Sequence, residues 1–131
     1  MNRPFPIRTE CPPGACVCER DRLLADPEGD IRILRLTKEE EKRLVARIES
    51  ISSFEDLKHI ESRMQAQLGL CLRITPGARE VRTLRGLSIV VEEMPGLCQK
   101  TRRAIPAAVR RCLERNPEIV YAILDAHDLL G

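Results

Sequence analysis

Aromatic side chains are almost missing from this sequence of 131 residues. It contains no tryptophan, and its aromatic residues are Phe5, Phe54 and Tyr121. Proteins that read single-stranded nucleic acid stack its bases on aromatic rings, and proteins that hold quaternary ammonium ligands enclose them in aromatic cages. This sequence has too few rings to build either kind of site.

Long apolar runs are missing as well. A membrane-spanning helix needs about 20 consecutive apolar residues, and the apolar runs of this sequence are much shorter. Residues 1–20 carry three cysteines and four prolines where a secretory signal has its apolar segment. We therefore expect a cytoplasmic protein with no membrane partner, in which the six cysteines stay reduced.

The common catalytic motifs are missing too. The sequence has no dinucleotide-binding fingerprint, P-loop, G-x-S-x-G or H-E-x-x-H, and its two histidines are His59 and His127. The sequence therefore identifies no reaction and favours a protein that is not an enzyme. A cysteine nucleophile, Cys98 or Cys16, stays open as an alternative, because catalytic partners can be distant in sequence.

Prolines, glycines and one alternating segment organise the first third of the chain. Residues 1–14 contain four prolines and a glycine, which predicts an irregular N-terminal arm. Residues 15–24 and 30–36 are predicted as two strands, since the second begins with alternating β-branched residues. The intervening segment Asp26-Pro27-Glu28-Gly29 has the residue order of a type I turn, so we expect a β-hairpin.

Two capped helices follow this hairpin. Thr37 precedes Glu40 by three residues and Ser53 precedes Asp56 by three, which is the signature of a helix N-terminus. Gly69 is expected to end the second helix. Apolar residues recur at helical spacing after each cap, at Leu44, Val45, Ile48 and Ile51, and then at Leu57, Ile60, Met64 and Leu68. The short link between the helices predicts that they pack as an antiparallel pair.

The second half again has strands before helices. Residues 70–74 and 81–92 are predicted strands, with Gly86 at a bulge or a turn. A third helix is expected to have Pro106 in its first turn, and a fourth to begin at Asn116-Pro117 and to run to about residue 130. The predicted order ββααββαα indicates an α+β fold, with a small antiparallel sheet covered by two helix pairs. Residues 15–131 form a single domain in this prediction.

The most informative motif is a cysteine cluster. Cys11, Cys16 and Cys18 lie within eight residues with the spacing C-x4-C-x-C. Zinc and iron–sulfur clusters need several thiolates close together, and the Pro-Pro-Gly turn after Cys11 can fold its sulfur toward the other two. The spacing matches neither the usual zinc pairs nor the common ferredoxin runs. Three unligated thiols on the arm are therefore the alternative.

A closed metal site needs a fourth ligand. Cys98 is the first choice, because it follows Pro95-Gly96 in a polar segment close to a helix start. Cys71 is the second, and Cys112 is expected in the core because it lies on an apolar helix stripe. The predicted ligands are thus Cys11, Cys16, Cys18 and Cys98. They would hold zinc or an iron–sulfur cluster in a structural, redox or sensing role.

Arginines offer an alternative function. The net charge is only +2, yet the second half is rich in basic residues. The candidate anion-binding residues are Arg79, Arg82, Arg85, Arg102 and Arg103. Guanidinium groups bind phosphates and carboxylates in two-point contacts, so this region is a candidate module for nucleic acid or an acidic protein partner. The competing interpretation is a solvated basic face that pairs with the acid-rich helices of residues 37–61. The oligomeric state is not predicted.

Overall fold

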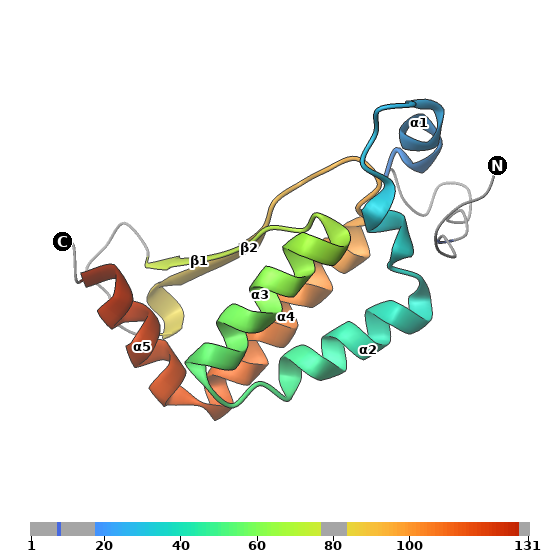
Figure 1. Cartoon of the computed structure of the whole chain (residues 1–131). Helices are drawn as coiled ribbons and strands as arrows, with labels where there is room; N and C mark the ends of the chain where they lie inside the picture. The colour runs from blue at the N-terminus through green and yellow to red at the C-terminus, as the bar shows by residue number, and fades with distance from the viewer. Residues whose placement is uncertain (1–7, 9–17, 77–83, 129–131) are drawn as a thin grey trace.

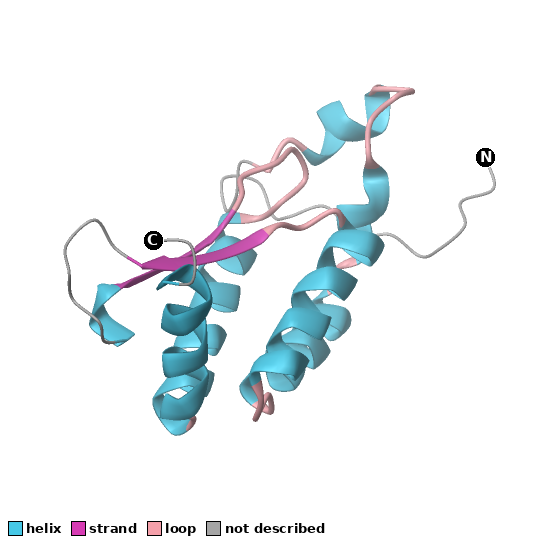
Figure 2. Ribbon diagram, turned by 60° about the vertical axis from the view of Figure 1, so that its left-hand side comes forward, coloured by secondary structure: helices cyan, strands magenta, loops and turns pink. Residues whose placement is uncertain are grey.

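A small antiparallel sheet lies along one side of a group of helices in this protein (Figures 1 and 2). The structure, a computed structural model, describes residue 8, residues 18–76 and residues 84–128. The elements in chain order are α1 (Arg20–Ala25), the 3₁₀ helix η1 (Ile31–Arg35), α2 (Lys38–Glu49), α3 (Phe54–Leu68), β1 (Leu72–Pro76), the 3₁₀ helix η2 (Leu84–Gly86), β2 (Leu87–Val91), α4 (Gln99–Arg115) and α5 (Pro117–Asp128). The predicted α+β class is confirmed. The predicted arm lies outside the described residues except for residue 8.

The predicted N-terminal hairpin is wrong, because α1 and η1 stand where its two strands were expected. Ile33 and Leu34 are adjacent in sequence and both fully buried, whereas a strand would point them to opposite faces. The turn itself is confirmed: the Gly29 N–H donates to the Asp26 carbonyl at 3.1 Å. The α-helices and strands of the described residues therefore follow the order αααββαα instead of ββααββαα.

The two predicted helix caps are confirmed. Thr37 Oγ1 accepts a hydrogen bond from the Glu40 N–H at 3.3 Å at the start of α2. Ser53 Oγ accepts one from the Asp56 N–H at 3.1 Å at the start of α3. Gly69 ends α3 with a left-handed φ of 72°, a conformation that glycine adopts without a steric penalty.

The packing of α2 differs from the predicted antiparallel pair. α2 packs along α4, and Arg111 Nε of α4 donates to Glu49 Oε1 of α2 at 2.6 Å. α2 and α3 diverge from the turn that joins them (Figure 1). Ile48 is the fully buried residue of α2, and Leu44 and Val45 pack against the core while staying half-buried. The remaining surface of α2 toward α3 stays open.

The sheet consists of β1 and β2, which are shorter and shifted relative to the predicted strands. Leu72 pairs with Val91 and Ile74 with Ile89 in an antiparallel register. Leu72 and Val91 face the core. Gly86 ends η2 directly before β2, so a short helical turn occupies the position where a bulge or a two-residue turn was expected.

The long helix α4 starts earlier than predicted. Pro106 therefore lies inside the helix instead of in its first turn. Proline has no N–H, so the Arg102 carbonyl lacks its helical donor there. The predicted inward-facing residues are confirmed as buried: Ile105, Val109, Cys112 and Leu113. The predicted start of α5 at Asn116-Pro117 is also confirmed.

Candidate functional site

The chain segments that carry Cys18 and Cys98 meet at the start of α4. The Gly96 N–H donates to the Cys18 carbonyl at 2.6 Å. Cys98, two residues after Gly96, is the N-cap of α4. The Cys18 and Cys98 residues are 9% and 8% exposed. Figure 1 shows the loop from β2 to α4 passing beside the α1–η1 segment. We call Arg8, Cys18, Gly96 and Cys98 the cysteine corner.

Gly96 makes this close approach of the two segments sterically feasible. Its φ is +90°, a left-handed conformation that side chains other than glycine rarely adopt. A Cβ at this position would lie 2.7 Å from Leu23 Cδ2 and 2.8 Å from Ile33 Cγ2. The backbone here is pressed against the core side chains of α1 and η1, so the corner requires glycine.

A buried guanidinium group completes the corner. Arg8 is only 7% exposed. Its Nη2 donates to the Gly96 carbonyl oxygen and lies 3.4 Å from Cys18 Sγ. The backbone of Arg8 is held on both sides, because its N–H donates to the Leu34 carbonyl at 2.6 Å and its carbonyl accepts from Arg20 Nε at 2.9 Å.

The charge of Arg8 has no carboxylate neighbour among the described residues. In the described part of the chain its guanidinium contacts a carbonyl oxygen and a sulfur, and its Nε and Nη1 are buried without a hydrogen-bond partner. Arginine remains protonated in proteins, and an uncompensated buried charge costs several kcal/mol. A thiolate is the anion that the corner's own side chains can supply.

The corner includes two of the four predicted metal ligands. Cys18 and Cys98 belong to it, whereas Cys11 and Cys16 lie outside the described residues. Over residues 18–76 and 84–128, no three side chains of the types His, Cys, Asp and Glu lie close enough to hold a metal ion. The four-cysteine site stays a prediction.

The remaining cysteines occupy separate places. Cys112 is 1% exposed, as predicted for a core residue, and its Sγ donates to the Ile51 carbonyl at 3.3 Å. Burial raises the pKa of the Cys112 thiol. Cys71 is half-buried directly before β1. His59 is exposed on α3, and the side chain of His127 lies outside the description.

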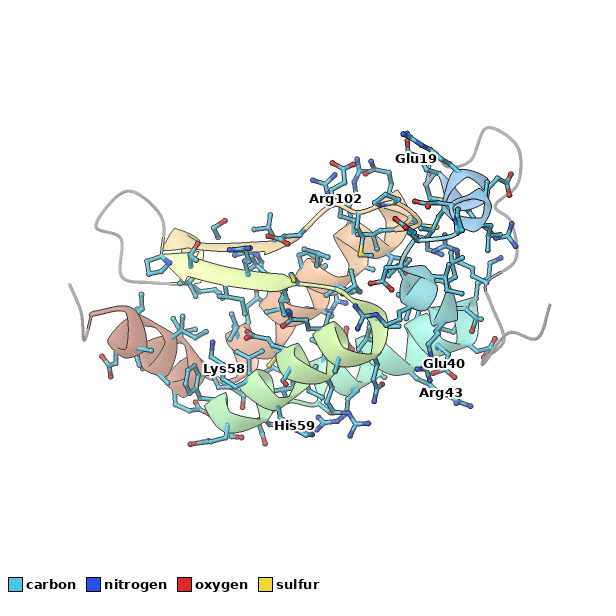
Figure 3. All side chains as sticks on the ribbon, turned by 45° about the horizontal axis from the view of Figure 1, so that its top comes forward. Glu19, Glu40, Arg43, Lys58, His59 and Arg102 are labelled. Carbon is cyan, nitrogen blue, oxygen red and sulfur yellow. The ribbon has the colours of Figure 1, made fainter. Side chains whose placement is uncertain are left out.

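The predicted anion-binding arginines are only partly described. Arg79 and Arg82 lie outside the described residues, and the description of Arg85 is limited to its backbone. Arg102, labelled in Figure 3, forms an ion pair with Glu93 at 3.5 Å. Arg103 is exposed near the start of α4. The grouping of these five arginines stays a prediction.

A second site, which the sequence did not predict, lies between α2 and α3. The diverging helices leave a cleft of about 590 Å³. Its lining contains four arginines, namely Arg35, Arg43, Arg47 and Arg63. We call this site, with its apolar floor, the basic cleft. Figure 3 labels Glu40 and Arg43 on α2 and His59 on α3, which lie on the same side of the molecule in that view.

Positive charge exceeds negative charge in the basic cleft. Four arginines line it, and Glu40 is the acidic residue among its lining residues. Arg43 Nη1 pairs with Glu40 at 3.2 Å. Arg47 binds Asp56 through two hydrogen bonds of 2.6 and 2.8 Å. These bonds hold the pKa of the Asp56 carboxyl below its usual range.

The sequence carries a signal for this cleft in the spacing of its polar residues. Arg43 and Arg47 are four residues apart, and so are His59, Arg63 and Gln67. Side chains with this spacing share one helix face. The signal was missed because the two helices were expected to pack against each other, which would have covered those faces.

The described residues contain no helix with the length and apolar composition needed to cross a membrane.

No protein-family model, no curated protein and no solved structure matches the chain. The cysteine corner and the basic cleft are therefore interpreted from their own chemistry.

Proposed function

We propose that this chain binds a metal centre through cysteine thiolates at the cysteine corner. The proposed ligands are Cys11, Cys16, Cys18 and Cys98, and the centre is zinc or an iron–sulfur cluster. The observation that carries the proposal is the buried Arg8 guanidinium at 3.4 Å from Cys18 Sγ. A cation in this position is stable where it meets negative charge.

The charge of a thiolate centre matches this environment. Four thiolates around one zinc ion leave a net charge of about −2, and N–H groups directed at ligand sulfurs stabilise such centres. Arg8 provides a charged N–H donor to Cys18. The N-terminus of α4 adds a positive partial charge beside Cys98, and its first turn carries no acidic residue. Both features place positive charge beside the proposed ligands.

Covalent geometry keeps the other two proposed ligands within reach. An extended chain spans at most about 3.6 Å per residue. Cys16 is two residues from Cys18, and Cys11 is three residues from Arg8. The distances between Cα atoms are thus at most about 7 Å and about 11 Å. The proposal places all four thiolates around one centre.

A structural role fits the position of the corner better than a catalytic one. The corner joins Arg8 and the segment before α1 to the start of α4. Arg8 and Gly96, which are hydrogen-bonded there, are 88 residues apart in the sequence. A metal centre there would tie the N-terminal segment to the core. Structural zinc sites stabilise small domains in this way.

The test is metal analysis of the whole chain purified without oxygen. We expect one zinc ion per chain in a colourless protein, or iron and sulfide in a brown one. Cys18→Ser and Cys98→Ser should each lose the metal. Cys71→Ser is the matched control, because Cys71 lies outside the corner, and it should keep the metal. A folded wild-type protein without metal would refute the proposal, as would equal metal loss in the control.

The predicted alternative is an interaction module for nucleic acid or an acidic protein partner. It uses the arginines Arg79, Arg82, Arg85, Arg102 and Arg103, of which Arg102 and Arg103 lie close to the start of α4. A labelled DNA duplex should then bind at low salt and dissociate steeply as salt rises. Binding that is absent at low salt, or that does not change with salt, removes this alternative for nucleic acid.

A further inference from the structure

The floor of the basic cleft is apolar. Five apolar residues line it: Leu36, Leu44, Ile60, Met64 and Leu68. Leu36, Ile60 and Met64 are buried in the core, whereas Leu44 and Leu68 are only half-buried. The cleft therefore presents apolar side chains to a binding partner, and the core beneath supports them.

The rim of the cleft is positively charged and solvated. The side chains of Arg43 and Arg47 on α2 are 78% and 44% exposed. Arg63 on α3 is exposed, and within residues 18–76 and 84–128 no carboxylate pairs with it. An apolar floor between charged rims is the arrangement of a protein interface, in which a dry centre is surrounded by polar contacts.

The shape of the cleft favours a helix over a small molecule. A site for a small ligand places a few buried polar groups around it, but the polar side chains that line this cleft are not buried. The cleft is lined by residues 40–47 of α2 and 59–68 of α3, which are about 12 and 15 Å long. A third helix of two to three turns fits a groove of this length.

We infer that the basic cleft binds an amphipathic helix of a partner protein, with Asp or Glu residues on both sides of its apolar stripe. The apolar stripe lies on the floor, where it covers Leu44 and Leu68. The carboxylates pair with Arg43 on one rim and with Arg63 on the other, while Arg47 stays bound to Asp56. Arginine suits this task because its planar group binds a carboxylate at two points.

The probe for this inference is a labelled synthetic helical peptide of about 15 residues, long enough to span the cleft walls. One version carries a leucine stripe flanked by glutamates, and two others replace the glutamates with lysines or glutamines. Fluorescence anisotropy with the full chain at low salt should show binding of the glutamate peptide and none of the lysine peptide. The glutamine peptide should bind at least about tenfold more weakly.

Three variants locate the binding site. The double variant Arg43→Glu, Arg63→Glu should weaken binding of the glutamate peptide at least about tenfold, because both rims then repel it. Lys42→Glu is the matched control on the same helix: Lys42 is exposed but does not line the cleft. It should change the affinity less than about twofold. Leu44→Gln should weaken binding without any change of charge.

Several results would overturn the inference. These are no binding of the glutamate peptide, equal losses in Lys42→Glu and the double variant, or binding unaffected by Leu44→Gln. If pyrophosphate binds in place of the peptide, and the double variant Arg43→Glu, Arg63→Glu abolishes its binding, the cleft is a site for a small anion. Dimerisation that Arg63→Glu abolishes, measured by sedimentation, would assign it to a second copy of the chain.

Discussion

The cysteine corner and the basic cleft place the same chemical group in opposite environments. Arg8 in the corner is 7% exposed and has no carboxylate neighbour among the described residues. Arg43 and Arg47 in the cleft are exposed, and each pairs with a carboxylate, on Glu40 and Asp56. A cation without an acidic partner is thus buried, while cations with partners face solvent.

This difference separates stability from binding. Burying a charge costs several kcal/mol unless an anion compensates it, whereas an exposed ion pair contributes about 0–1 kcal/mol. Changes in the corner should therefore alter folding and metal retention. Changes at the rim of the cleft should leave the fold nearly unaffected and alter partner binding.

The largest expected effect is that of Gly96→Ala in the corner. The left-handed backbone and the contacts with Leu23 and Ile33 should together lower the free energy of unfolding by about 3 kcal/mol. Gly69→Ala is the control, with φ +72° but with the flexible ends of Asp30 and Arg32 as neighbours, and about 1 kcal/mol is expected there. Urea denaturation measures both. Equal losses would show that the corner is not more tightly packed than the end of α3.

Arg8→Met should have the next largest effect, on metal retention. Loss of the charged donor to Cys18 should weaken zinc binding about 10- to 100-fold, as is typical for groups that support metal ligands. Competition with a zinc chelator measures this affinity. Arg22→Met is the control, because the Arg22 side chain is 81% exposed on α1. Equal zinc affinity of the Arg8 variant and the control would contradict the proposal that a metal centre compensates the buried charge of Arg8.

Cys112 sharpens the comparison, since it is a buried thiol whose sulfur bonds to the Ile51 carbonyl and not to an arginine. Burial raises its pKa in the folded protein, so its contribution to stability is complete below the ordinary thiol pKa of about 8.5. The contribution is lost as pH rises from there through the raised pKa, by at most about 1.4 kcal/mol per pH unit. Unfolding free energies across alkaline pH should show this slope in the wild type and in Cys71→Ala. Cys112→Ala should lack it, and an unchanged slope would contradict the assignment.

The smallest expected effect concerns Arg47 and Asp56 at the cleft. A double-mutant cycle with Arg47→Ala and Asp56→Asn should give a coupling of about 0.5 kcal/mol, because the pair is solvated. The pKa of Asp56 is lowered by Arg47, so the contribution is present above the ordinary Asp pKa of about 3.9. It disappears as pH falls through the lowered value. A coupling that persists in full at lower pH would contradict the ion pair.

Local signals in the sequence predicted the parts of the fold that depend on neighbours along the chain. Thr37 and Ser53 cap their helices, Gly69 ends α3 and Pro117 begins α5, because each of these features involves residues only a few positions apart. The segment around Ile33 was misread since a short apolar run fits either a strand or a buried helical turn. Packing against the core decides between them.

The sites depend on contacts that no local pattern encodes. Arg8 stands in a proline-rich arm without any motif, and its importance comes from Gly96, 88 residues later. Cys98 was predicted because it follows a Pro-Gly break before a helix, and Gly96 in that break does bond to Cys18. The basic cleft depends on the divergence of α2 and α3, which is set by the packing of α2 on α4.

The contacts of Arg8 also have a consequence for ligand assembly. Arg8 and Cys18 are held together, although nine residues separate them in the sequence. Groups tethered to two such fixed positions reach an effective concentration in the millimolar range when the linkers are short. A metal ion that first binds Cys18 would then meet Cys11 and Cys16 in an intramolecular step, with much of the loop-closure entropy already lost during folding.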